Sequence, residues 1–387
     1  MNETGKPEEN IWQELDRRLA KDMTYESGRI LGSMCTRPHD IALEVFTHFL
    51  EKNLGDPGLF PGTAEIEKEV LKELAELFHC PTADGSLVTG GSEANLIGMR
   101  IAKKLKNKVL NPEFIVPASG HASFDKAADL LDIKLVKIPL EEDFSLAPEK
   151  VAEQVTPNTI GIVGVAGSTA LGLVDPIEEL GHIARENNLY FHVDAAFGGF
   201  VLPFLSDLGY EIPKWDFEVP EVNSLTADPH KMGMNVIPSG GFLFRDCSLL
   251  EELGFNIPYL AGGCFKHLQI TGTRPGGVAI AFWALIKSLG REGFRNIVKN
   301  AMDLTHYLAS EIEIIPRIKL ATQPTMNIVG IIPEGDSLSA PDLDARLREK
   351  GWALGCFRRE NLVRVVLMPH VTQEHIDEFL ADLKTCL

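Results

Sequence analysis

The 387-residue chain is predicted to be an α/β protein, with a mostly parallel sheet in a large domain and a small C-terminal α+β domain. The first observation is that apolar strand-like runs alternate with amphipathic helical segments through residues 64–290. This alternation is typical of βαβ units, which place helices on both faces of a sheet. The second is that helical and strand-like segments continue beyond Gly290. The third is the length, which suits one large and one smaller domain at about 150 residues per domain.

The composition narrows the function classes. Hydrophobic residues make up 44% of the chain and charged residues 24%, which is ordinary for a globular protein with a sizeable core. The net charge of −18 disfavours nucleic-acid phosphates and anionic membranes as partners. The N-terminus is polar, and no apolar run is long enough to span a bilayer. The six cysteines form no CxxC pair, so we expect reduced thiols, a cytoplasmic protein and no metal site.

Residues 1–63 are assigned to an N-terminal arm. Helical spacing places Ile11, Leu15 and Leu19 on one face, which would need another surface to cover it. The glycines and prolines near its end indicate either a plain linker or a functional loop. The predicted elements are helices at 11–23 and 39–53, an extended stretch at 28–38 and a loop at 55–63.

Residues 64–290 are assigned to the large domain. Its helices show apolar positions three or four residues apart, as at Ile66, Val70 and Leu74, and its strands are short and apolar. We expect a mobile loop at 256–263, where glycine and proline interrupt the pattern. The predicted helices are 65–79, 92–105, 124–131, 177–187 and 278–289, and the predicted strands are 86–89, 114–117, 134–139, 159–166, 189–194, the run before Lys231, and 240–244.

Residues 291–387 are assigned to the small domain. A helical pattern covers 294–314, and strand-like runs cover 325–332 and 362–368. Arg364 lies within the last of these runs. A strand arginine is commonly part of the scaffold, although its planar guanidinium also binds carboxylates bidentately.

Lys231 is the first candidate catalytic residue. It lies in Asp228-Pro-His-Lys-Met-Gly233, where turn residues would hold it at the end of a short apolar strand. A lysine in a partly desolvated pocket loses its proton more easily and can form a Schiff base with an aldehyde. A single lysine is usually a surface charge, so this interpretation depends on its neighbours in the fold.

Asp194 is the neighbour that changes the interpretation. It ends the apolar strand 189–194, and open α/β sheets bind ligands at the carboxyl ends of their strands. A strand-end aspartate followed by a strand-end lysine is the two-anchor pattern of pyridoxal-phosphate enzymes. The lysine carries the aldehyde, and the aspartate keeps the pyridine nitrogen protonated so that the ring accepts electrons.

Gly90, Gly91 and Ser92 precede a predicted helix, and glycines at a helix start bind phosphate through free N–H groups. Ser92 could instead be an ordinary N-cap, and the missing lysine excludes a Walker loop. His121 lies at another strand-to-helix turn, where alone it would more often cap the helix.

Five stretches together resemble the group II pyridoxal-phosphate decarboxylases of the fold type I superfamily, and within them the archaeal L-tyrosine/L-aspartate decarboxylase family. The resemblance implies a seven-stranded sheet with one antiparallel strand, pyridoxal 5′-phosphate as cofactor, and a homodimer with shared active sites. The matching stretches are Gly55–Thr63, Thr89–Asn95, His192–Gly199, Asp228–Gly233 and Arg364–His370.

The resemblance also implies residue roles. His121 would stack on the cofactor ring, Thr169 would contact the ring oxygen, and Ala196 would leave room for the flat ring. The segment holding Thr273 and Arg274 would reach the partner's cofactor phosphate, although Pro275 departs from the family pattern there, as Ala170 does near Thr169. The implied catalytic residues are Lys231, Tyr259 as proton donor and His121; the implied cofactor contacts are Gly91, Ser92, His121, Thr169, Asp194, Ala196, His230, Lys231 and Thr273; and the implied substrate contact is Arg364.

The predicted reaction is decarboxylation of an L-amino acid to its amine. The resemblance implies L-tyrosine to tyramine, L-aspartate to β-alanine or both, which would supply methanofuran and coenzyme A biosynthesis. Glutamate decarboxylation and carbon–carbon cleavage on the same fold stay open. From another class, a metal hydrolase could use His192 and Asp194, which share one strand face. That alternative leaves Lys231 without a role.

Overall fold

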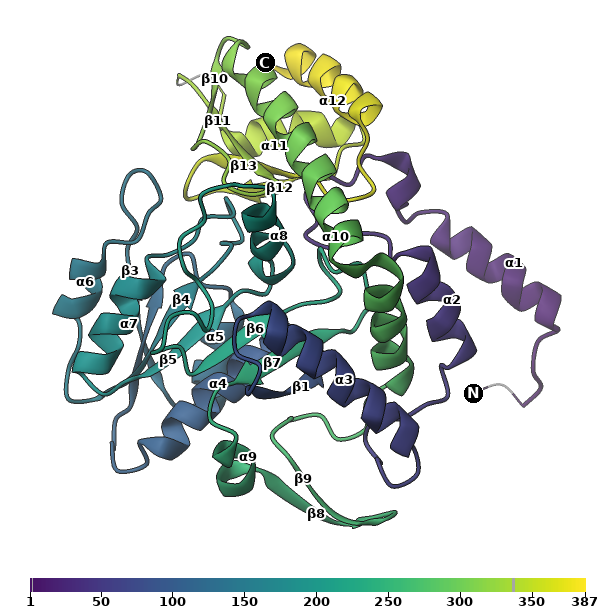
Figure 1. The fold of residues 1–387 in the computed structure, drawn as a ribbon. Helices are drawn as coiled ribbons and strands as arrows, with labels where there is room; N and C mark the ends of the chain where they lie inside the picture. Colours follow the sequence, from purple (N-terminus) through teal and green to yellow (C-terminus); the bar gives the residue numbers. More distant parts are fainter. Residues whose placement is uncertain (2, 336–337) are drawn as a thin grey trace.

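The computed structural model describes residues 1, 3–335 and 338–387 (Figure 1). Its large sheet has seven strands in the order β1-β7-β6-β5-β4-β2-β3, and β7 runs antiparallel to both of its neighbours. The other pairings are parallel, which confirms the mostly parallel sheet with one antiparallel strand. The strands are β1 (Asp84–Val88), β2 (Glu113–Pro117), β3 (Lys134–Ile138), β4 (Thr159–Val165), β5 (Tyr190–Asp194), β6 (Ser224–Ala227) and β7 (Gly240–Phe244).

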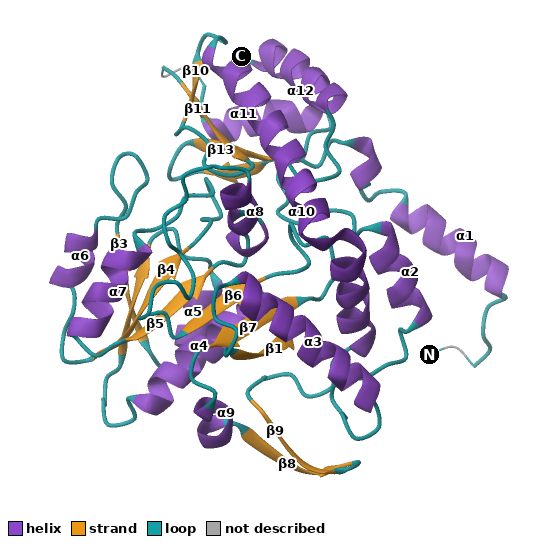
Figure 2. Cartoon of the chain, viewed as in Figure 1, coloured by secondary structure: helices purple, strands orange, loops and turns teal. Residues whose placement is uncertain are grey.

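Helices cover both faces of this sheet (Figure 2). Successive strand residues point to opposite faces, so Ile162 joins the core on one side and Val163 joins the core on the other. Every residue of β4 and β5 is buried, as expected for central parallel strands. The helices of this domain are α3 (Pro61–Leu77), α4 (Gly91–Leu105), α5 (Ser123–Leu131), α6 (Pro148–Glu153), α7 (Ile177–Glu186), α8 (Leu202–Asp207) and α9 (Ser248–Leu253).

A small domain with its own core follows the large one. Its four-stranded antiparallel sheet has the order β10-β11-β13-β12. The long helix α10 (Gly276–Glu313) leads into it from the large domain, and Gly290 interrupts α10 with a non-helical conformation. The other elements are β10 (Ile318–Leu320), β11 (Ile328–Pro333), α11 (Ala340–Glu349), β12 (Gly355–Phe357), β13 (Leu362–Val366) and α12 (Gln373–Cys386).

The N-terminal segment contains α1 (Glu8–Leu19), a 3₁₀ turn (Tyr25–Ser27) and α2 (Asp40–His48). α2 packs against α10, whereas none of the twelve described residues of α1 is buried. Between the helices, Ile30 forms a parallel bridge with Ala353 of the small domain. Within the described residues, no helix combines the length and apolar character needed to cross a membrane.

Two local predictions were wrong. Residues 256–263 were expected to be a loop, but they belong to the hairpin of β8 (Phe255–Leu260) and β9 (Gly263–His267). Gly262 and Gly263 adopt positive φ values at its turn, so the glycines that suggested a loop reverse the chain instead. The loop predicted at 55–63 ends early, because Pro61 begins α3, where its fixed φ and missing N–H suit a first helical position.

Candidate active site

A cavity of about 250 Å³ lies where β4, β5 and β6 end, which is the ligand-binding edge of an open α/β sheet. Val165 ends β4 and Asp194 ends β5, and Lys231 follows β6 by a short turn; all three line the cavity. The topology therefore brings together the two anchors that the sequence separates. The predicted site residues in the lining are Gly91, Ser92, His121, Thr169, Asp194, Ala196, His230 and Lys231.

The start of α4 forms one wall of the cavity. Gly90 is the N-cap residue, and no described side chain caps the helix, so Ser92 does not have the alternative role of an N-cap. A Cβ on Gly90 would lie 3.0 Å from His230 Cε1, and one on Gly91 would lie 3.0 Å from Asp228 Oδ2. Only glycine fits both places without displacement, which leaves helix-start N–H groups beside the cavity, where they can bind an anion.

Lys231 occupies a confined position in the cavity lining. Its Nζ lies 3.3 Å from Asp228 Oδ2, and only 19% of its side chain is exposed. The neighbouring His230 accepts a hydrogen bond at Nδ1 from the Ser239 N–H, at 3.1 Å. Burial lowers the pKa of His230, so this ring is neutral near pH 7.

Asp194 is buried at the end of β5. Its Oδ1 accepts a hydrogen bond from the Ala196 N–H at 3.1 Å, and its Oδ2 accepts one from Asn95 Nδ2 at 2.8 Å. Each carboxylate oxygen of Asp194 is therefore held by one donor of the fold. The sequence interpretation did not assign Asn95 a role, although it lies on α4 one turn after Gly91 and Ser92. The same is true of Asp228, which lies three residues before Lys231.

His121 lines the cavity rim, and its Nδ1 also accepts a hydrogen bond from the Ser123 N–H at the start of α5. The helix-start contact of His121 is therefore present. Because the residue also lines the cavity, stacking on a cofactor ring stays a prediction. The buried Ser119 Oγ and Asp228 Oδ1 line the same space and have no hydrogen-bond partner within the described part of the chain. Unpaired buried polar atoms indicate a polar ligand. The donors, the glycine wall and these atoms fit a phosphorylated pyridine aldehyde.

Arg364 lies behind Thr169 rather than in the cavity lining. Its Nη1 donates to the Thr169 carbonyl and its Nη2 to the Gly32 carbonyl, while its buried Nε has no partner among the described residues. Burial lowers the pKa of this guanidinium to about 10, and the group remains charged at neutral pH.

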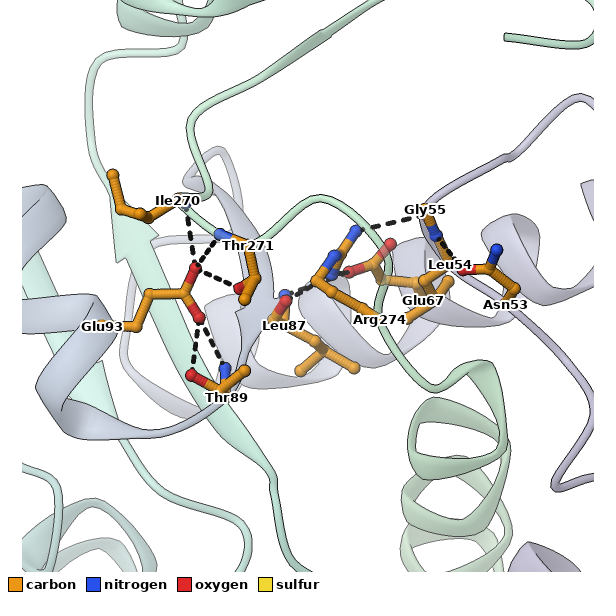
Figure 3. Close-up of polar contacts among 10 residues, drawn as sticks. All are labelled: Asn53, Leu54, Gly55, Glu67, Leu87, Thr89, Glu93, Ile270, Thr271 and Arg274. Atoms are coloured by element: carbon orange, nitrogen blue, oxygen red, sulfur yellow. Dashed lines mark hydrogen bonds and ion pairs between the residues drawn. The ribbon is translucent and has the colours of Figure 1, made fainter. Parts of the chain in front are cut away.

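Tyr259 and Thr273 lie away from this cavity and are exposed. Arg274, from the same segment as Thr273, points inward instead: it pairs with Glu67 Oε1 at 2.9 Å and donates to the Leu87 carbonyl (Figure 3). The expectation that Arg274 donates to a partner's phosphate is therefore wrong, because its own chain occupies the guanidinium.

Figure 3 also shows that Glu93 ties this segment to the start of α4. One carboxylate oxygen accepts hydrogen bonds from the N–H groups of Ile270 and Thr271 and from the Thr271 hydroxyl. The other oxygen accepts from the N–H and the hydroxyl of Thr89. Burial acts to raise the pKa of Glu93, but the hydrogen bonds from Thr271 and Thr89 together outweigh it, so the pKa lies below its usual value.

His192 does not serve the metal-hydrolase alternative. It is fully buried, with Nδ1 lying 2.8 Å from Ser224 Oγ and Nε2 lying 2.9 Å from Asn95 Oδ1. Burial lowers its pKa to about 4. Because both ring nitrogens are occupied, neither can coordinate an ion beside Asp194.

Fold and cavity together define a pyridoxal-phosphate site of the fold type I class, with a lysine and an aspartate beside a glycine-rich helix start. Residues 3–331 match the family described as "Pyridoxal-dependent decarboxylase conserved domain". The chain belongs to this family, and it is a pyridoxal-phosphate-dependent amino-acid decarboxylase.

Several relatives support this assignment along the whole chain. The L-aspartate/L-glutamate decarboxylase of Pyrococcus horikoshii is 46% identical over 383 residues, covering 99% of this chain and 98% of that one. A probable L-tyrosine/L-aspartate decarboxylase of Methanothermobacter thermautotrophicus is 45% identical over 362 residues, covering 94% and 98%. Among solved structures, a sphingosine-1-phosphate lyase of Burkholderia pseudomallei gives a TM-score of 0.91 at 27% identity, covering 100% of this chain and 92% of that one.

Proposed function

We propose that the enzyme converts L-aspartate to β-alanine and carbon dioxide, with L-tyrosine to tyramine as its second reaction. The observation that carries the reaction class is that Lys231, Asp194 and the start of α4 face one cavity. Aspartate ranks first because both relatives described above are named for it, whereas only one is named for tyrosine and one for glutamate. The products would enter coenzyme A and methanofuran biosynthesis, as the family resemblance implies.

Each residue of the cavity would have a separate role in binding the cofactor. Gly91 and Ser92 would bind the cofactor phosphate, and Lys231 would hold the cofactor covalently until the substrate amine displaces it. When bound, pyridoxal phosphate withdraws the electrons that remain on the α-carbon after the carboxylate leaves. Asp194 would keep the ring nitrogen protonated.

The remaining predicted residues would orient the ring and the substrate. His121 would stack on the ring, Thr169 would contact its oxygen, and Ala196 and His230 would border it. We assign the substrate carboxylate to Arg364, as the family resemblance implies. Its Nη1 donates to the carbonyl of the cavity residue Thr169, and its buried Nε has no partner among the described residues.

A product assay tests the substrate. The purified holoenzyme is given L-aspartate, L-tyrosine or L-glutamate, and released carbon dioxide and the amine are both measured, with Lys231→Ala as the inactive control. We expect kcat/KM for aspartate to exceed the others by about tenfold or more, since unpaired polar groups penalise the wrong side chain. A preference for glutamate or tyrosine would overturn the substrate alone. Release of glycine, which keeps the α-carboxylate, without carbon dioxide would instead indicate carbon–carbon cleavage between the α- and β-carbons.

We also propose a homodimer with shared active sites. The family resemblance assigns the segments 55–63 and 271–277 to the partner's site, and both lie together with the tip of the hairpin that holds Tyr259. A Cβ on Gly58 would lie 1.5 Å from the carbonyl oxygen of Ala261 at the hairpin tip, and one on Gly55 would lie 2.7 Å from Thr273 Cα. These segments therefore form one projecting unit, from which Tyr259 and Thr273 would enter the partner's cavity.

The face of α1 supports the same proposal. Its side chains Ile11, Trp12, Leu15 and Leu19 are all exposed. A continuous apolar stripe of this kind marks an interaction surface, and a second copy would cover it in an obligate dimer.

Two further assignments accompany this proposal. We divide the chain into an arm (1–63), a large domain (64–290) and a small domain (291–387), because α10 is interrupted at Gly290 and each domain has its own core. We place the enzyme in the cytoplasm, because all six cysteines are free thiols and a reducing compartment preserves them.

A further inference from the structure

Asn95 has a complete set of hydrogen bonds in the buried layer beneath the cavity. Its Nδ2 donates to Asp194 Oδ2 at 2.8 Å and to Ser123 Oγ at 2.9 Å. Its Oδ1 lies 2.9 Å from His192 Nε2 and accepts from Thr226 Oγ1 at 2.9 Å. The residue is 1% exposed, so water cannot replace any of these partners.

The orientation of this amide follows from its partners. A carboxylate only accepts hydrogen bonds, so the side that faces Asp194 must be the NH₂ group. The carbonyl oxygen then faces His192, and Nε2 must carry the ring proton because two acceptors cannot share a hydrogen bond. It also follows that His192 Nδ1 accepts from the Ser224 hydroxyl, at 2.8 Å. One amide therefore fixes both the carboxylate and the histidine tautomer.

The position of Asn95 on α4 links this hydrogen-bond network to the proposed phosphate site. The helix begins at Gly91, beside the proposed phosphate site, and one turn later it presents Asn95 to Asp194. One helix would therefore set the distance between the phosphate site at its start and the aspartate that binds the ring nitrogen. Among the described residues, the Asp194 carboxylate would otherwise accept a hydrogen bond only from the Ala196 N–H, at 3.1 Å.

We propose that Asn95 is a positioning residue, which orients Asp194 toward the ring nitrogen and fixes His192 as the Nε2–H tautomer. The inference rests on the proposed role of Asp194. A merely structural Asn95 would stabilise the large domain and would affect any ligand of the cavity equally. A positioning Asn95 acts only through the ring nitrogen, and this difference can be measured by binding alone.

The test compares pyridoxal phosphate with its 1-deaza analogue, in which carbon replaces the ring nitrogen. Equilibrium binding of each to the cofactor-free enzyme is followed by absorbance, for wild type, Asn95→Ala and Asn223→Ala. Asn223 is a matched control, because its side chain binds the Phe191 N–H at the far end of β5. We expect Asn95→Ala to weaken pyridoxal phosphate binding about tenfold, as for one hydrogen bond to a charged group. It should weaken binding of the deaza analogue less than about threefold, and Asn223→Ala should affect the two ligands equally.

Equal weakening of both ligands by Asn95→Ala, or no weakening, would overturn the proposal. If the wild-type enzyme binds the two ligands equally, Asp194 does not interact with the ring nitrogen, and the proposed role of Asp194 is wrong. This result differs from one in which only the Asn95 variant fails to discriminate between the ligands, so the two proposals are tested separately. A second measurement, of the His192 tautomer, uses the wild-type enzyme and therefore does not depend on whether Asn95→Ala folds. Histidine ¹⁵N spectra of the wild-type holoenzyme, with the signal assigned by its loss in His192→Gln, should show the Nε2–H tautomer. An Nδ1–H tautomer would overturn the proposed amide orientation.

Discussion

At the scale of single residues, the chemistry depends first on which lysine holds the cofactor. Lys231 is the cavity lysine whose amine is confined beside Asp228. We therefore predict that borohydride treatment of the holoenzyme attaches the pyridoxyl group to Lys231. Peptide mapping by mass spectrometry locates the label, and Lys231→Ala should lose it. A pyridoxyl group on any other lysine would contradict the assignment.

Lys231 and Asp194 could be predicted because Asp194 ends an apolar strand and Lys231 follows another by a short turn. The carboxyl ends of parallel strands meet at one edge. Asn95 could not be assigned in the same way. Its role depends on which face of α4 turns toward β5, and that is set by packing rather than by its own motif. The prediction for Arg274 was wrong for a related reason. The sequence does not show that Glu67 lies close enough to form an ion pair with its guanidinium.

Asp175 gives a pH-dependent prediction at this scale. Burial raises its pKa from 3.8 to about 7, against the lowering effect of the Val165 N–H that it accepts. The folded state therefore binds a proton that the unfolded state releases above about pH 4, so this group destabilises the fold as pH rises toward 7. The full shift corresponds to on the order of 4 kcal/mol.

Asp175→Asn should remove that slope, because its amide oxygen still accepts from Val165 and cannot ionise. Urea unfolding at pH 5 and pH 8 measures the difference, with the exposed Asp22→Asn as control. We expect the free energy of unfolding of Asp175→Asn, relative to wild type, to be higher at pH 8 than at pH 5. The same relative stability at both pH values would show that Asp175 is already ionised in the fold.

At the scale of elements, the hairpin β8–β9 shows what local patterns leave undecided. Gly262 and Gly263 are compatible with a flexible loop or with a tight reversal between strands. The pairing of Phe255 with His267 decides between them, and it joins residues that no short window covers together. The helices and the central strands were more predictable, because their apolar periods extend over whole elements.

Glu93 holds the base of this hairpin unit through five hydrogen bonds to Thr89, Ile270 and Thr271. Glu93→Gln keeps the shape but turns an NH₂ group toward one of these two sets of donors. We predict a loss of about 1–3 kcal/mol in the free energy of unfolding. We also predict faster hydrogen exchange at the amides of Ile270 and Thr271.

The control is Glu51→Gln, which removes an exposed pair with Lys52 and should cost well under about 1 kcal/mol. Unfolding in urea gives the free energies, and exchange read by mass spectrometry locates the loosened segment. If exchange in the 270–271 region stays at the wild-type rate, Glu93 does not anchor the hairpin.

At the scale of the whole molecule, the proposed dimer determines how Tyr259 can act. It is 82% exposed and lies away from its own cavity, so it can return a proton to the α-carbon only in the partner's site. Lys231→Ala and Tyr259→Phe chains should each make little correct amine alone. In a hybrid, one cavity combines the intact lysine of one chain with the intact tyrosine of the other.

Mixing the two variants under conditions that exchange subunits should therefore restore about one quarter of wild-type amine formation, since half the dimers are hybrids with one intact site of two. A chain carrying both substitutions, mixed with Tyr259→Phe, provides the control and should give no rescue. Sedimentation confirms that hybrids form. If hybrids form and both mixtures stay equally inactive, Tyr259 does not serve the neighbouring cavity. If a monomer is fully active, each cavity must be complete within its own chain, and the exposed face of α1 would need another occupant.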